Sequence, residues 1–194
     1  MQTYKVTVDE DKTTRWYNDK DERHRLDGPA VEWLDGYKAW WIDGKLHRLD
    51  GPAVEYADGS KSWYVDGKHH RLDGPAIEWA NGSKSWYVDG KLHRTDGPAN
   101  EWADGTKKWY INGKRHRLDG PAVEWASGNK AWYVGDKLHR LDGPAIERAN
   151  GFKEWYLDGK KITEEEFNKY TKPKPSCEGK VVEVDGVKYK LVKA

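Results

Sequence analysis

The chain has 194 residues, of which 35% are charged, and its 34 Lys and Arg against 33 Asp and Glu leave a formal charge of +1. Because the two signs alternate without a basic cluster, the composition argues against a general binder of nucleic acid or anionic membranes. The mean hydropathy of −1.07 is low enough for disorder, but twelve Trp and eleven Tyr indicate a folded chain that buries large rings.

The single cysteine, Cys177, excludes an internal disulfide and a cysteine-rich zinc site. No apolar run is long enough to span a bilayer, and no signal peptide follows Met1. These features predict a protein of the cytoplasm without a membrane partner.

Residues 1–23 are expected to form an N-terminal cap. Trp16 and Tyr17 match a Trp-Tyr pair that recurs later, but one extra residue separates them from His24. Terminal units of stacked repeats commonly depart from the consensus in this way.

Residues 24–161 form six units of 23 residues. Each unit opens with the motif His-Arg-x-Asp-Gly-Pro-Ala, and no insertion interrupts the series, which starts at His24, His47, His70, His93, His116 and His139. A fixed period in this range is typical of stacked repeat architectures.

Each unit is expected to hold two or three short strands. In the second unit, residues 53–56 and 61–65 alternate in polarity, and turns are expected at Asp58-Gly59 and Asp66-Gly67. Pro52 breaks the chain between strands. We therefore predict an all-β fold, an elongated single-sheet solenoid of stacked antiparallel hairpin repeats, with a short C-terminal helix cap and a terminal hairpin.

Two ladders of aromatic rings follow from this register, and each ring is expected to stack on its neighbours. One ladder is Trp33, Tyr56, Trp79, Trp102 and Trp125. The other is a structural ladder of Trp40, Trp63, Trp86, Trp109, Trp132 and Trp155.

Residues 162–171 are expected to form a capping helix. Thr163 and Glu166 have the spacing of a capping box. Phe167 and Tyr170 are expected to pack inward against the last hairpin.

Residues 172–180 read as a stiff Lys-Pro linker, and residues 181–194 as a β-hairpin with an Asp185-Gly186 turn. An isolated hairpin is only marginally stable. The hairpin is therefore expected to dock, either on its own array or on a second copy, which leaves a monomer and a homodimer both open.

The recurrent polar residues do not form a credible reaction centre. Equivalent histidines of successive units are expected about 10–14 Å apart, which is too far to share a metal ion. Cys177 has no histidine nearby in sequence, and the recurrent glutamates occur once per unit. We expect no enzyme activity, no metal and no cofactor, and we interpret the recurrent set as scaffold.

Specific function is then expected where the units differ. The fourth unit has Thr95 in place of Leu and Asn100 in place of Val or Ile, and so loses two apolar groups. The predicted binding residues, drawn mainly from the third to fifth units, are His69, Thr95, Asn100, Lys108, Arg115, Tyr37 and Phe152.

Residues 16–161 resemble the bacterial and phage variants of the MORN-repeat family. The resemblance rests on the 23-residue period, the Asp66-Gly67-Lys68 turn, the Gly-Pro-Ala break and the Gly-x-x-x-Trp-Tyr strand. The Tyr-x-Gly opening of the eukaryotic repeats is absent, so their lipid roles transfer weakly. The resemblance implies a scaffold or interaction surface.

We therefore expect a non-enzymatic protein-binding scaffold, encoded by a phage, that occupies a host defence or regulatory protein in the host cytoplasm. The alternatives are nucleic-acid or nucleotide binding through the aromatic and Arg ladder, and a structural or assembly component that uses the C-terminal hairpin.

Overall fold

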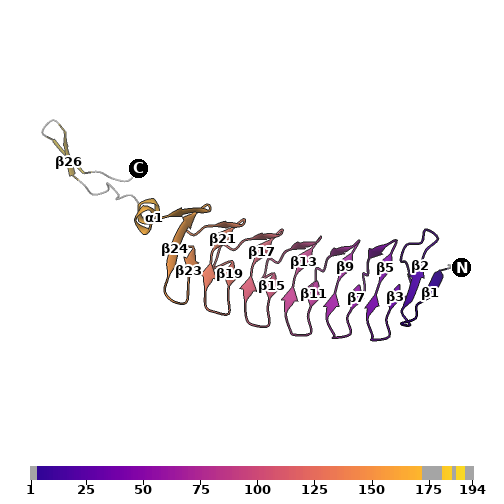
Figure 1. Ribbon diagram of the computed structural model, residues 1–194. Coiled ribbons are helices and arrows are strands. Elements are labelled where there is room, and N and C mark those ends of the chain that lie inside the picture. The colour runs from indigo at the N-terminus through magenta and orange to yellow at the C-terminus, as the bar shows by residue number, and fades with distance from the viewer. Residues whose placement is uncertain (1–3, 172–180, 185–186, 191–194) are drawn as a thin grey trace.

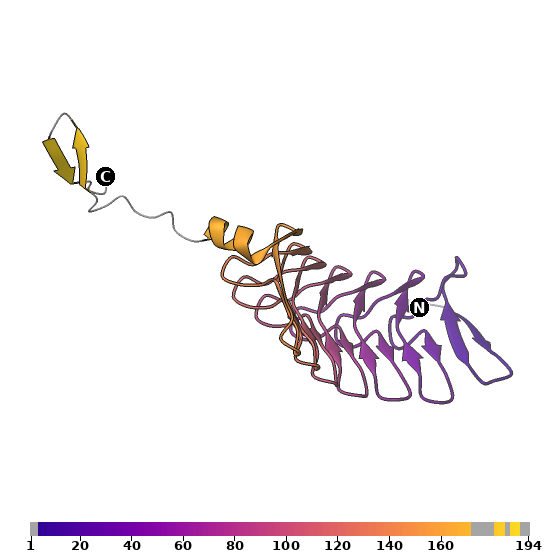
Figure 2. The ribbon, with the colours of Figure 1, turned by 60° about the vertical axis from the view of Figure 1, so that its left-hand side comes forward.

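The computed structural model describes residues 4–171, 181–184 and 187–190. Residues 4–171 form an elongated row of stacked hairpin units, and α1 (Glu164–Thr171) lies at its C-terminal end (Figures 1 and 2). The predicted all-β fold with hairpin repeats and one short C-terminal helix is confirmed.

A 15-stranded antiparallel sheet runs the length of the row. Its strands, in spatial order, are β1 (Lys5–Val8), β2 (Thr14–Tyr17), β3 (Val31–Glu32), β4 (Lys38–Ala39), β7 (Val54–Glu55), β8 (Lys61–Ser62), β11 (Ile77–Glu78), β12 (Lys84–Ser85), β15 (Asn100–Glu101), β16 (Lys107–Lys108), β19 (Val123–Glu124), β20 (Lys130–Ala131), β23 (Ile146–Glu147), β24 (Lys153–Leu157) and β25 (Lys160–Ile162).

A second row of two-stranded hairpins lies beside the sheet (Figure 1). The hairpins are β5 (Trp41–Ile42) with β6 (Lys45–Leu46), β9 (Tyr64–Val65) with β10 (Lys68–His69), β13 (Tyr87–Val88) with β14 (Lys91–Leu92), β17 (Tyr110–Ile111) with β18 (Lys114–Arg115), and β21 (Tyr133–Val134) with β22 (Lys137–Leu138). The sheet is therefore accompanied by separate hairpins, which the sequence interpretation did not anticipate.

The expected strand 61–65 is divided at Trp63. The Trp63 N–H donates to the carbonyl of Ala76 in the next unit, and its carbonyl accepts from the N–H of His70. The chain therefore leaves the sheet at Trp63 and starts the β9–β10 hairpin. In the last unit β24 continues through Trp155 without a break, because no following unit offers a carbonyl.

The Asp-Gly turns of the second row require a left-handed backbone. Asp66 and Gly67 have φ of 49° and 77°, as in the tight turns that suit two-residue hairpins. His47 Nδ1 lies 3.0 Å from the Asp66 carboxylate, so the motif histidine of the unit holds the turn of its own hairpin.

An arginine guanidinium covers each ladder tryptophan from Trp40 to Trp132. Arg48 lies 4.0 Å from the Trp40 ring and Arg94 lies 4.0 Å from Trp86. The expected ring-on-ring stacking of this ladder is wrong. Equivalent positions are two strands apart, about 9.6 Å, which is beyond the reach of paired rings, and the arginine fills the space.

The side of the sheet that carries these arginines also bears an unbroken alternation of carboxylates and ammonium groups. Glu55, for example, lies opposite Lys38 on one strand and Lys61 on the other. The series is Glu32, Lys38, Glu55, Lys61, Glu78, Lys84, Glu101, Lys107, Glu124, Lys130, Glu147 and Lys153. Opposite charges on facing strands stabilise the register.

The capping helix begins with the predicted capping box. The Glu166 N–H donates to Thr163 Oγ1, and the Thr163 N–H donates to the Glu166 carboxylate. Phe167 is buried as expected, but Tyr170 is 75% exposed. Position 170 is about 60° around the helix from Phe167, so Tyr170 points to solvent.

Two further strands, β26 (Val181–Val184) and β27 (Val187–Lys190), pair antiparallel as predicted for the C-terminal hairpin. Its expected turn, the Lys-Pro linker and Cys177 lie outside the described residues.

Candidate functional site

The other side of the sheet carries two rows of aromatic rings, and we call it the aromatic face. A rim row of Trp33, Tyr56, Trp79, Trp102 and Trp125 follows the ends of the sheet strands. A hairpin row of Trp41, Tyr64, Tyr87, Tyr110 and Tyr133 lies on the second row of strands, and Tyr156 continues it on β24 of the sheet. Between them runs a floor of small and aliphatic residues that begins with Val31, Ala39 and Val54.

Packing contacts place these rows on one side. Trp41, Leu46 and Tyr64 of the second row pack against the buried floor cluster that includes Val54. One repeat further on, Tyr56 and Trp79 of the rim line a hollow together with Tyr64.

The rim rings are 37–47% exposed, which is high for tryptophan and tyrosine arranged in one row. The hairpin-row tyrosines are half-buried, and burial together with neighbouring phenols raises the pKa of Tyr64 to about 12. The Tyr64 phenol therefore remains neutral and can donate a hydrogen bond at physiological pH.

The floor carries polar residues in the second, third and fourth units, namely Ser62, Ser85, Asn100 and Lys108. Asn100 is buried, and its side-chain amide donates to the Ser85 hydroxyl across the sheet. The corresponding pair two repeats earlier is Val54 and Ala39. Asn100 is thus a buried polar group whose amide has found a partner.

We expect Asn100→Val to destabilise the chain by about 1 kcal/mol, because it leaves the buried Ser85 hydroxyl without its partner. Adding Ser85→Ala should recover that loss, since the pair then matches Val54 and Ala39. Urea unfolding of both single variants and the double variant gives the coupling. Additive losses would contradict the proposed pairing.

Six of the seven predicted binding residues lie on the aromatic face. Tyr37 contacts the rim rings, His69 and Arg115 belong to second-row strands, and Asn100 and Lys108 lie on the floor. Phe152 occupies the hairpin position equivalent to Tyr37 and lies under Arg148. Thr95 is the exception, because it lines a hollow with Arg94 and Asp96 on the charged side.

The cations of this face rest on its rings. Lys108 Nζ lies 4.7 Å from the Trp102 ring, and the Arg115 guanidinium lies 4.0 Å from Tyr133. The inverted Gly135-Asp136 turn accounts for the arginine at position 115. The Asp136 carboxylate accepts a hydrogen bond from Arg115 Nε at 2.7 Å. The inversion therefore supplies a carboxylate for the one arginine at this position of the repeat.

His69 is inserted between two tyrosines of the hairpin row. Its ring centroid is 4.0 Å from that of Tyr64 and 5.2 Å from that of Tyr87. Burial lowers the pKa of His69 from its ordinary value of 6.5. Asp58 is the carboxylate that lines the same hollow.

Stability is expected to depend on pH through His69. Because the folded state lowers the pKa of His69, the unfolded state binds the proton more readily, so the stability of the folded chain falls as pH drops through 6.5. His69→Leu places the side chain found at Leu46 and Leu92 and should flatten this dependence between pH 8 and pH 5 relative to the parent. Urea midpoints measured across that range test this prediction. If the midpoint of His69→Leu changes with pH as steeply as the parent's, the assignment to His69 is contradicted.

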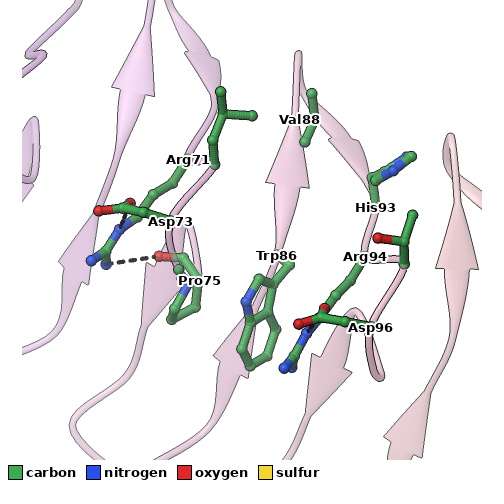
Figure 3. A pocket seen from close by; sticks show the side chains of 11 residues that line it. Arg71, Asp73, Pro75, Trp86, Val88, His93, Arg94 and Asp96 are labelled. Atoms are coloured by element: carbon green, nitrogen blue, oxygen red, sulfur yellow. Dashed lines mark hydrogen bonds and ion pairs between the residues drawn. The ribbon is translucent and has the colours of Figure 1, made fainter.

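Four similar hollows of 560–600 Å³ lie on the charged side, one at each of four unit boundaries. Figure 3 shows one of them, with Trp86 beside Arg94 and with Arg71 bonded to Asp73 and to the Pro75 carbonyl. Their arginines and aspartates already neutralise each other. These hollows are larger than the one on the aromatic face, but their recurrence follows from the scaffold.

The sequence analysis missed a row of exposed leucines on the charged side. Leu49, Leu72 and Leu118 are each 80% exposed, while Leu26 and Leu141 are 57% and 63% exposed. Thr95 interrupts this row, so the apolar group that is lost by its replacement of Leu is an exposed one. These leucines were missed because residues that recur in every unit were interpreted as packed residues of the scaffold.

Among the described residues, no group of three or more His, Cys, Asp or Glu is placed to hold a metal ion. No helix in the described part of the chain is long and apolar enough to span a membrane. No protein-family model matches the chain, and no curated protein matches it significantly. Any functional conclusion therefore depends on the residues and their geometry.

Proposed function

We propose that this chain is a non-enzymatic repeat scaffold that binds another protein through the aromatic face. The observation that carries the proposal is the rim row, whose five rings are 37–47% exposed above half-buried tyrosines. Tyrosine, tryptophan and arginine are enriched at interface hot spots. A row of exposed rings on a rigid support loses little conformational entropy on binding.

The MORN-like pattern supports the wider setting of this proposal. The protein is phage-encoded, acts in the host cytoplasm and occupies a host defence or regulatory protein. A chain with one cysteine needs no oxidising compartment. The partner takes the aromatic face because the charged side already has its arginines paired with carboxylates.

Nucleic-acid binding is the second candidate, favoured by Lys108 and Arg115 beside rings of the aromatic face. Base stacking on exposed rings with nearby cations is the usual mode of single-strand binding. The ion pair of Arg115 with Asp136 weakens this candidate, since phosphate contact requires free positive charge.

The test is affinity capture from bacterial lysate with and without nuclease, comparing three forms of the chain. Trp79→Ser with Trp102→Ser removes two rim rings, and Leu49→Thr with Leu72→Thr alters the opposite side using the residue of Thr95. One partner that resists nuclease, is lost with the rim variant and is retained by the leucine variant supports the proposal. Loss with nuclease supports nucleic acid, and equal recovery by both variants contradicts the use of this face.

A C-terminal hairpin that pairs with another copy would make the protein an assembly component and a homodimer in solution, whereas a hairpin that docks on its own array would leave a monomer. Light scattering on the full chain and on a chain ending at residue 172 tests this third candidate. An unchanged monomeric mass excludes it.

A further inference from the structure

The rim rings are separated by a position whose residue varies along the array. This position lies across the hairpin turn from each rim ring, and in the second unit the Tyr56 N–H donates to the Ser60 carbonyl. The six residues at this position are Tyr37, Ser60, Ser83, Thr106, Asn129 and Phe152.

In the first unit this position is filled by an aromatic ring. The Tyr37 centroid lies 4.7 Å from that of Trp33 and 5.7 Å from that of Tyr56. Below the ring, Tyr37 packs on the floor cluster of Val31, Ala39 and Val54. Both separations are within the 4.5–7 Å range of favourable aromatic pairs.

In the second unit the same surroundings are present without the ring. Ser60 replaces Tyr37, and a hollow of about 340 Å³ opens beside it. Its walls are Tyr56, Ser62, Tyr64, His69, Ile77 and Trp79. Each of these residues is 23 positions after a residue at the Tyr37 site, namely Trp33, Ala39, Trp41, Leu46, Val54 and Tyr56.

The other units do not repeat this combination. The third unit has the amide of Asn100 where Ile77 forms the floor, and in the fourth Lys108 covers the Trp102 ring. The fifth has Arg148 as one wall, and the sixth fills the position with Phe152. The second unit alone combines a ring on both sides, the aliphatic Ile77 in the floor and a small residue between the rings.

We propose that this hollow, which we call the Tyr56–Trp79 slot, binds the side chain of a tyrosine from the partner protein, in the position that Tyr37 occupies in the first unit. The inference rests on the proposed protein-binding function. Tyrosine suits the slot because the walls offer rings for its face, and Asp58, Ser62 and His69 for its hydroxyl. Rings that bury an apolar body and keep a polar end satisfied are the usual interface anchors.

The first test uses p-cresol, the side chain of tyrosine, observed by saturation-transfer NMR against the full chain. Binding is expected in the millimolar range appropriate to so small a ligand, and 4-methylcyclohexanol, which is similar in size but not planar, should bind at least tenfold more weakly. Absence of p-cresol binding, or equal binding of both compounds, would overturn the proposal.

Two variants copy side chains that the neighbouring unit already carries. Ser60→Tyr should fill the slot from within and abolish p-cresol binding, while Tyr37→Ser should open an equivalent slot between Trp33 and Tyr56 and double the bound stoichiometry. Circular dichroism checks that both variants stay folded. If Ser60→Tyr binds p-cresol as the parent does, the ligand lies elsewhere and the slot is wrong.

The capture experiment separates this inference from the function on which it depends. Loss of the partner with Ser60→Tyr as well as with the rim variant supports both proposals. Loss with the rim variant but full recovery by Ser60→Tyr overturns the slot and leaves the aromatic face as the binding surface. Full recovery by both variants contradicts the proposed function itself.

Discussion

Arg94→Ala should destabilise the array by about 2–3 kcal/mol. Arg94 covers the Trp86 ring at 4.0 Å, and its Nη1 donates to the Glu101 carboxylate at 3.1 Å and to the Pro98 carbonyl at 3.3 Å. A desolvated cation over an indole and a hydrogen bond between charged groups each contribute about 1–3 kcal/mol. Urea unfolding followed by tryptophan fluorescence measures the loss.

Asp96→Ala is the matched control for this substitution. Asp96 accepts from Arg94 Nε at 2.9 Å, but its side chain is 78% exposed. Exposed ion pairs contribute little, so the control should unfold almost as the parent does. An equal loss for both variants would mean that the exposed ion pair, and not the stack on Trp86, stabilises the unit.

Gly97 provides an independent check of the same contact. A Cβ at Gly97 would lie 2.9 Å from the guanidinium carbon of Arg94, although its backbone φ is outside the left-handed region. Gly97→Ala should therefore destabilise the parent by about 1 kcal/mol or more, and much less in the Arg94→Ala background. Additive effects would show that the glycine is required for another reason.

The repeat period predicted the fold because each unit carries the same turn chemistry. Asp66-Gly67 and its equivalents fix tight turns, and Thr163 with Glu166 fixes the start of the helix. The division of each unit between two rows could not be predicted from alternation alone. It depends on the bond from Trp63 to Ala76 of the next unit, which is a contact between units.

The candidate site was predictable in part. Departures from the consensus led to His69, Asn100 and Arg115, and these share one face because equivalent positions of stacked units line up. Departures from the consensus could not identify the rim row, because its rings recur in nearly every unit and were therefore interpreted as scaffold. The rim rings differ from the packed scaffold residues in their exposure to solvent, and solvent exposure cannot be read from a repeated sequence.

Ala76→Leu is expected to have the largest effect on folding of any single substitution in the array. Ala76 is fully buried, as are Ala30, Ala53, Ala99 and Ala122, and its carbonyl accepts the Trp63 N–H at the junction of two units. Three added carbons in a closed site cost about 3 kcal/mol through overpacking. The damage falls on one interface near the middle of the array.

The position of that interface determines the form of the unfolding curve. The stability of a stacked array is approximately a sum of unit terms and nearest-neighbour interfaces, so breaking the interface between the second and third units should separate the array into two blocks. Ala76→Leu should then unfold in two steps, each with a smaller dependence on urea than the parent's single transition.

Ala30→Leu introduces the same clash at the first unit, where only residues 4–23 lie beyond it. Because all six units remain stacked after that break, Ala30→Leu should keep one main transition close to the parent's slope and lose only a small early amplitude. Urea unfolding of the two variants, followed by circular dichroism and tryptophan fluorescence, compares the same substitution at the two positions. Identical single transitions for both would mean that the 15-stranded sheet unfolds as one cooperative body, whose stability is not set by interfaces between neighbours.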